Sequence, residues 1–156
     1  MGQPFDIDNL AKPVLECLGG RPTSVWVTVA EGMDVGVLLT STPPPPAPLD
    51  ALTLSVKSPR SRSTRPVVPM SELANLPRLG TADQTIGLEL AFDADQSISD
   101  FGFTGPIKPL IDGMENILGP GPHGPADHRI KDLRIVKGNE PHHIGVTIRL
   151  WLIPPN

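Results

Sequence analysis

The chain has 156 residues, which is enough for one domain or for two small ones. Its 20 prolines and 15 glycines predict many loops and turns. The formal net charge of −4 excludes a general attraction to nucleic acid or to anionic lipid, so a polyanionic partner would need a local basic patch. The single cysteine, Cys17, excludes an internal disulfide. The absence of a long apolar run and of a signal-peptide pattern predicts a cytoplasmic protein without a membrane partner.

The first expected element is a helix that begins near residue 9. Pro13 has no amide hydrogen to donate in a helix interior, so it must lie near the first turn, and Asp8 or Asn9 is the expected N-cap. Asp6 and Asp8 have an Asp-x-Asp spacing ahead of this helix and could converge on one divalent ion. Oxygen ligands favour Mg²⁺, for which Mn²⁺ can substitute, and Lys12, one turn further on, could hold a phosphate oxygen. The simpler alternative is that Asp8 only caps the helix and Asp6 is solvated.

Two strands are expected after this helix, over residues 25–29 and 35–39, and a proline-rich segment follows over residues 43–49. Consecutive prolines favour the stiff polyproline II conformation, which has no internal hydrogen bonds. We interpret the segment as a linker. Its alternative function is to serve as a ligand for proline-binding modules.

A basic loop follows the next expected strand, residues 52–56. It carries four cations and no acidic residue, and the cations are Lys57, Arg60, Arg62 and Arg65. Phosphate contact is the natural function of such a loop, and a solvated loop without a partner is the alternative. Over residues 83–100 every charged residue is acidic. In a DNA-binding protein that stretch would face away from the phosphates or hold metal.

A second helix is expected over residues 106–118. Its apolar residues recur at the helical period and form one stripe, which consists of Ile107, Leu110, Ile111, Met114 and Leu118. Pro106 suits a first helical position, and Gly119 ends the helix where the stripe ends. Lys108 and Asp112 are neighbours on the opposite face.

Four strands accompany this helix, over residues 52–56, 86–92, 133–136 and 144–152. Together these elements predict an α+β fold, in which a mixed or antiparallel sheet carries the helix on one face. Trp26 and Trp151 are expected to pack in a core or on a sheet face.

The two helices belong to a repeated unit. The Lys-Pro pair at residues 12–13 recurs 96 residues later at 108–109, and each helix precedes two strands. We interpret this pattern as the duplication of a helix-strand-strand unit, whose strands either extend one sheet or pair as a pseudo-dimer. It divides the chain into a partial copy, a linker and a second copy, over residues 1–42, 43–49 and 50–156.

The motif at the first helix resembles the RusA-type Holliday junction resolvases, which are crossover junction endodeoxyribonucleases of phages and bacteria. In that family an Asp-x-Asp-Asn segment opens a helix with a lysine one turn in, an acidic pair follows, and two strands close the domain. The first part is matched by Asp6, Asp8, Asn9 and Lys12. Asp127 and the stretch after it resemble the passage from the acidic pair into the closing strands. The basic loop resembles the family's Pro-, Lys- and Arg-rich segment.

The similarity covers residues 5–42 as the back half of one RusA-like domain and residues 50–156 as a degenerate whole one. The second copy has lost the paired carboxylates, because Asp6, Asp8 and Asn9 are replaced there by Gly102, Thr104 and Gly105. The resemblance therefore implies that Asp6 and Asp8 meet Asp127 of the other copy, either within one chain or across a homodimer.

The resemblance implies a Mg²⁺-dependent, structure-selective DNA endonuclease that acts on branched DNA, such as a four-way junction, in recombination and repair. Asp6, Asp8 and Asp127 would hold the metal, and Lys12 would hold the scissile phosphate. The DNA backbone would be contacted by Lys57, Arg60, Arg62 and Arg65. The alternative is a catalytically inactive RusA-like fold that serves as a DNA-binding or protein-interaction module. Zinc is disfavoured, because the short ligand spacings of zinc sites are missing around His123, His128, His142 and His143.

Overall fold

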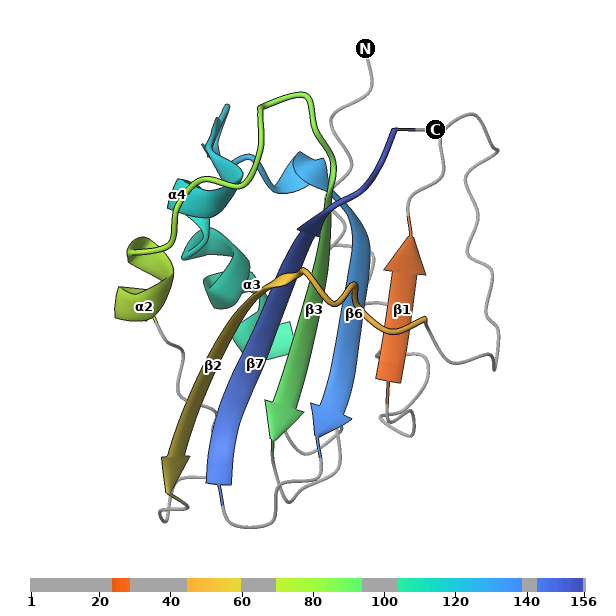
Figure 1. The fold of residues 1–156 in the computed structure, drawn as a ribbon. Helices are drawn as coiled ribbons and strands as arrows, with labels where there is room; N and C mark the ends of the chain where they lie inside the picture. The colour runs from red at the N-terminus through yellow and green to blue at the C-terminus, as the bar shows by residue number, and fades with distance from the viewer. Residues whose placement is uncertain (1–23, 29–44, 60–69, 94–103, 139–142, 156) are drawn as a thin grey trace.

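The structure is a computed structural model, and it describes residues 24–28, 45–59, 70–93, 104–138 and 143–155. Five strands form one sheet in the order β1-β6-β3-β7-β2 (Figure 1). Their bounds are Ser24–Thr28 for β1, Leu52–Pro59 for β2, Ile86–Asp93 for β3, Ile130–Gly138 for β6 and His143–Leu152 for β7. The strand β3 is parallel to β6, and the other neighbouring strands are antiparallel. The predicted α+β class with a mixed sheet is confirmed.

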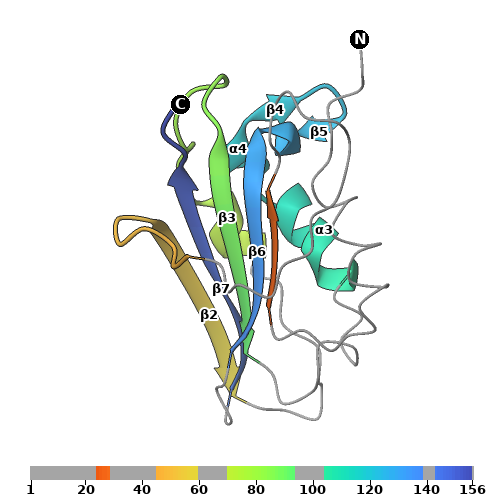
Figure 2. The same cartoon turned by 90° about the vertical axis from the view of Figure 1, so that its right-hand side faces the viewer.

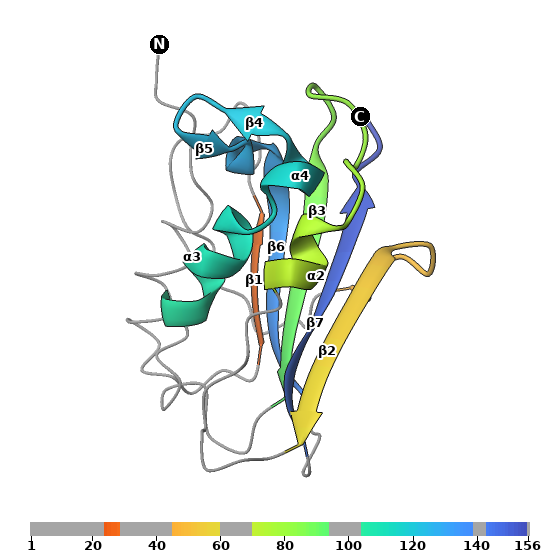
Figure 3. The same cartoon turned by 90° about the vertical axis from the view of Figure 1, so that its left-hand side faces the viewer.

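The remaining elements are short. The helices are α2 (Met70–Ala74), α3 (Thr104–Asp112) and α4 (Glu115–Leu118). A small hairpin of β4 (Pro120–Gly121) and β5 (Gly124–Pro125) follows α4, and the 3-10 turn η2 (Asp127–Arg129) leads into β6. Figures 2 and 3, which view the sheet from its two edges, show α2, α3 and α4 on the same face.

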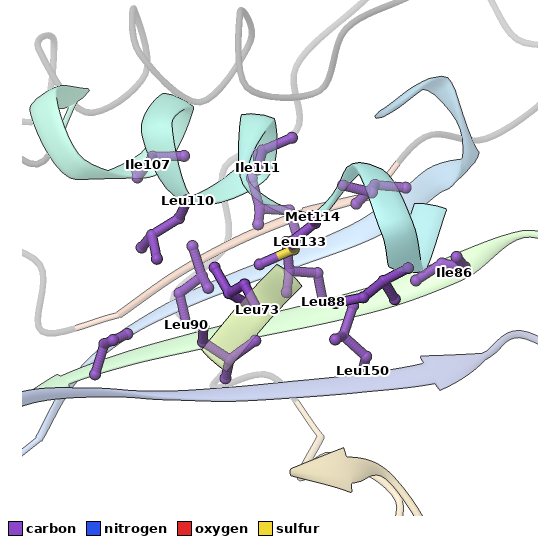
Figure 4. Close-up of a cluster of buried hydrophobic side chains, with 14 of the residues drawn as sticks. Leu73, Ile86, Leu88, Leu90, Ile107, Leu110, Ile111, Met114, Leu133 and Leu150 are labelled. Carbon is purple, nitrogen blue, oxygen red and sulfur yellow. The ribbon is translucent and has the colours of Figure 1, made fainter. Parts of the chain in front are cut away.

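Alternation along the strands gives this face its apolar surface. In β3 every second residue is at most 1% exposed, and these residues are Ile86, Leu88, Leu90 and Phe92. Leu133 and Ile135 of β6 are equally buried, as is Leu150 of β7. Figure 4 shows Leu110 and Met114 of the helical layer lying over this surface. The core is therefore a single layer of side chains between sheet and helices.

The prediction of one continuous helix over residues 106–118 is wrong in its first residue and in its continuity. It begins two residues earlier, at Thr104, and it is interrupted between Asp112 and Glu115. The amide of Met114 bonds to the carbonyl of Ile111 at 2.9 Å, which is a tightened 3-10 turn. Gly113 is a weak helix former, and this favours the break at that point.

The apolar stripe itself is confirmed. Its five members are at most 4% exposed, and Ile117 of α4 is fully buried beside them. The ammonium of Lys108 lies 3.4 Å from a carboxylate oxygen of Asp112, so the expected pair on the opposite face is also confirmed. The stripe survives the break because the Gly113 turn keeps α4 on the same side of the sheet.

The helix α2 was not predicted from the sequence. Its five residues are too few for a periodic pattern, yet its Leu73 is fully buried. The amide of Asn116 in α4 donates to the carbonyl of Ala74, which ties α2 to the helical layer. A polar contact between remote segments leaves no periodic signal in a sequence.

The strand predicted over residues 25–29 is present as β1, and it extends the sheet by pairing with β6. The expected strands at 52–56, 86–92, 133–136 and 144–152 are also present, each with somewhat wider bounds. The first expected helix and the strand expected at 35–39 lie outside the described residues. The duplication and the division into two copies therefore remain predictions.

Replacement of Leu110 by Ala tests the role of the stripe. Leu110 is fully buried, so the change should lower the free energy of unfolding by about 2–5 kcal/mol, because it removes apolar contacts and leaves a cavity. Urea denaturation followed by circular dichroism measures the loss. In the same helix, Asp112→Ala removes one member of an exposed ion pair and should change stability by less than about 1 kcal/mol. Equal losses in the two variants would contradict a helix buried on one face only.

Candidate nucleic-acid interface

Asp127, the one proposed metal ligand within the described residues, lies in η2 immediately before β6. Asp127 is partly buried. The turn is anchored on both sides, because the amide of Ala126 bonds to the carbonyl of Gly119 at 2.8 Å and the amide of Arg129 bonds to the carbonyl of Ala126 at 3.1 Å. Asp127 is therefore held at the end of the sheet where the parallel strands β3 and β6 both begin.

Arg129 fixes the same turn from within. Its guanidinium is buried, and it donates to the carbonyl of Gln84 at 2.9 Å and to that of Leu79 at 2.7 Å. It also donates to the carbonyl of Leu118, the last residue of α4. One side chain thus joins the loop before β3, the end of the helical layer and the start of β6. Because Asp127 is only two residues away, this arrangement restrains its backbone.

The electrostatics at this end of the sheet combine both signs of charge. Burial lowers the pKa of Arg129, the nearby cation Arg78 lowers it further, and Asp83 opposes the shift. The hydroxyl of Thr81 donates to a carboxylate oxygen of Asp83 at 2.6 Å. This bond lowers the pKa of Asp83, and a hydrogen bond to the backbone of Asp83 itself lowers it further. Asp83 is therefore a stable anion close to the buried Arg129.

The basic loop begins at the opposite end of the sheet. Lys57 of β2 pairs with Gly145, which pairs with Asp93 near the end of β3. Asp93 pairs with Gly138, the last residue of β6, whereas Asp127 precedes the first. Along the strand direction, the length of β6 therefore separates the two positions by roughly 25 Å. Because β3 and β7 lie between β6 and β2, a DNA segment that touched both positions would cross the sheet obliquely.

The other proposed site residues, Asp6, Asp8, Lys12, Arg60, Arg62 and Arg65, lie outside the described residues. Within the described ranges no group of three or more His, Cys, Asp or Glu side chains is arranged to hold a metal ion. Among the histidines, His128 lies at the start of β6 and His143 at the start of the antiparallel β7, so the two are at opposite ends of the sheet.

Sequence reasoning missed a polar and aromatic cluster on the face opposite the helices. Arg134 of β6 lies between two indole rings, with its guanidinium carbon 5.7 Å from the centre of Trp26 and 4.6 Å from that of Trp151. The carboxylate of Asp132 accepts bonds from Arg134 at 2.8 and 3.2 Å and from the indole N–H of Trp26 at 2.8 Å. The side chain of Arg134 is only 5% exposed, so this ion pair is largely desolvated.

The cluster continues across the sheet through cross-strand pairs. Glu89 of β3 opposes Arg134 on one side and Arg149 of β7 on the other, and Arg149 donates to it. Trp151 lies across Gly87, the residue opposite it in β3. The alternation of Asp132 and Arg134 in β6 is the signal that could have indicated a polar sheet face.

Comparisons of this chain with models of known protein families, with curated proteins and with solved structures find no match. Within the described residues, no helix is long and apolar enough to cross a membrane.

The absence of a side chain at Gly87 is predicted to be essential for the packing of the Trp151 ring on β3. A Cβ atom at this position would lie 2.0 Å from Cε2 of the indole, so Gly87→Ala should reduce the free energy of unfolding by about 1–3 kcal/mol. Chemical denaturation measures this loss. The control is the same change in a Trp151→Val background, where the ring is absent and the loss should shrink. An equal loss in both backgrounds would show that the ring is not the cause.

Proposed function

We propose that this protein is a Mg²⁺-dependent, structure-selective DNA endonuclease of the RusA type that acts on branched DNA in recombination and repair. The observation that carries the proposal is the place of Asp127. It lies between the helical layer and two closing strands, on a turn restrained by Arg129, which is the position that the resemblance gives to a metal ligand. The strands β6 and β7 follow the helices α3 and α4, and the resemblance likewise implies two closing strands after a helix.

The second copy indicates how the first motif would be arranged. Thr104 corresponds to Asp8 and is the first residue of α3, so Asp8 would stand at the start of the first helix. Lys108 corresponds to Lys12, and its side chain is 62% exposed on the helix surface. A lysine at this position of the first helix would face solvent, where it could reach a phosphate.

In the proposed site Asp6, Asp8 and Asp127 hold Mg²⁺, because an all-oxygen donor set suits this hard cation. When bound, the ion would supply an activated water and stabilise negative charge on the phosphate. Lys12 would hold an oxygen of the scissile phosphate. The cations of the basic loop would contact backbone phosphates, which gives binding that tolerates different sequences and weakens with salt. The carboxylates of the two copies would meet within one chain or across a homodimer.

A non-catalytic DNA-binding or protein-interaction module is the second candidate. It is favoured by the residues at the start of α3, where Thr104 and Gly105 replace the acidic and amide side chains of the first copy. Neither residue supplies a carboxylate. This half of the chain would then retain a RusA-like arrangement without the paired carboxylates at the start of its helix.

Replacement of Asp8 by Asn separates the two candidates. In an active enzyme this change should abolish cleavage of a mobile four-way junction, because it removes a metal ligand, while junction binding stays equal or becomes tighter as a negative charge is lost. Cleavage is measured in Mg²⁺ and in Mn²⁺, and binding by gel shift in EDTA. The control Asp112→Asn alters an exposed carboxylate of α3 and should leave both unchanged.

The unmodified protein, measured in the same assays, distinguishes the nuclease from the non-catalytic module. Binding without cleavage in either metal would reject the enzyme and retain the binding module. Neither binding nor cleavage would reject both DNA functions.

The basic loop has its own test. Changing Lys57, Arg60 and Arg62 together to Ala should weaken junction binding and flatten its dependence on salt. The slope of log affinity against log salt should fall by about 0.9 for each phosphate contact that is lost. Fluorescence anisotropy at several salt concentrations measures the slope. An unchanged slope would exclude the loop from the interface.

A further inference from the structure

A proline-rich segment crosses the sheet face that the helices leave open. The chain from residue 45 to the start of β2 runs from the side of β1 in front of β6, β3 and β7 (Figure 1), and we call its first four residues, 45–48, the proline strap. Figure 2 shows the same segment on the side of the sheet away from α3. The strap therefore lies on the face that carries the Trp26, Arg134 and Trp151 cluster.

The strap has the chemistry of a polyproline II ligand. The pyrrolidine ring fixes φ in its three prolines, and Ala47 is held extended because Pro48 follows it. The described residues contain no cis peptide bond. A segment of this kind has no internal hydrogen bonds, so its carbonyls are available to a donor on another surface.

Arg134 supplies that donor. Its Nη1 group donates to the carbonyl of Pro45, while Asp132 holds the rest of the guanidinium in place. Trp26 and Trp151 flank the donor, and Trp26 remains 41% exposed. Surfaces lined by aromatic rings are those on which proteins bind proline-rich segments, and Arg134 adds a hydrogen-bond donor between two such rings.

The strap is attached lightly compared with a core segment. Pro45, Pro46 and Pro48 are all exposed, and only Ala47 is partly buried. The strap ends in a turn in which the amide of Ala51 bonds to the carbonyl of Pro48 at 3.1 Å, and Leu49 in that turn is fully exposed. Release of the strap would therefore uncover little apolar surface of its own, and a segment of the same chemistry could replace it.

We propose that the open face of the sheet is a binding site for polyproline II segments, with the proline strap as its resident ligand. The strap occupies the donor of Arg134 in cis and competes with any proline-rich segment of another molecule. This competition is strong because a tethered ligand acts at a local concentration in the millimolar range. The proposal is independent of the nuclease activity, since it uses none of the residues assigned to metal or DNA.

The sequence provides a direct reporter, because the chain has two tryptophans and both lie in the site. The full chain is compared with a strap variant in which Pro45, Pro46 and Pro48 are all replaced by Gly. A synthetic peptide with the sequence of residues 41–50 is added to each while tryptophan fluorescence is recorded. The strap variant should respond with a saturable change at a peptide concentration about tenfold lower than the unmodified chain, because its own strap no longer competes effectively.

Controls define the site. In the strap-variant background, Arg134→Gln should abolish the response, whereas Ser55→Ala, at an exposed position of β2 on the same face, should retain it. A peptide in which serine replaces every proline should give no response. Equal midpoints for the unmodified chain and the strap variant, or no saturable response from a strap variant with unchanged circular dichroism, would overturn the proposal.

A second measurement covers a strap variant that does not fold. The unmodified chain is mixed with the same peptide at about 10 mM, which exceeds the expected local concentration of the strap. The indole N–H signals of Trp26 and Trp151 in a nitrogen–proton NMR spectrum should then shift as the strap is displaced. Unshifted signals would overturn the proposal.

Discussion

The parallel pairing of β3 with β6 is the constraint on which the rest of the fold depends. Two adjacent parallel strands cannot be joined by a tight turn, so the chain must leave the sheet after Asp93 and return to the same end before Ile130. The helices α3 and α4 lie in this connection, and their apolar stripe covers one face of the sheet. Arg129 closes the connection, because it binds the end of α4 at the point where β6 begins.

The two faces of the sheet are stabilised by different physics. Apolar burial holds the helical face, where the largest side chains are completely enclosed. On the other face the stabilising contacts are directional, since cations, carboxylates and indoles alternate between neighbouring strands. Directional contacts lose more when one member is removed, because the partner is left buried with its charge unmatched. The open face should therefore tolerate fewer substitutions than its partial exposure suggests.

Much of the sheet could be predicted because its alternating strands are a local pattern. The apolar stripe of α3 could also be predicted from its period. The interruption of the helix at Gly113 could not, because a tightened turn keeps the same residues on the same face. Helix α2 was missed because one buried leucine and one amide contact from Asn116 do not create a period. The Arg134 cluster joins strands β1, β6 and β7, so it exists only once the strand order is known. For the candidate site, the predicted role of Asp127 stays a prediction, and the sequence did not indicate the buried Arg129 that restrains its turn.

The strand order also has a kinetic consequence. The strand β1 pairs with residues more than 100 positions further along the chain, and β2 pairs with residues more than 80 positions further along. Such non-local pairing makes folding slow, because long loops must close before any contact is gained. During synthesis β1 and β2 leave the ribosome long before β6 and β7 exist to receive them. The N-terminal half of the sheet must therefore wait in an incompletely folded state, in which exposed strands are vulnerable to aggregation and depend on chaperones.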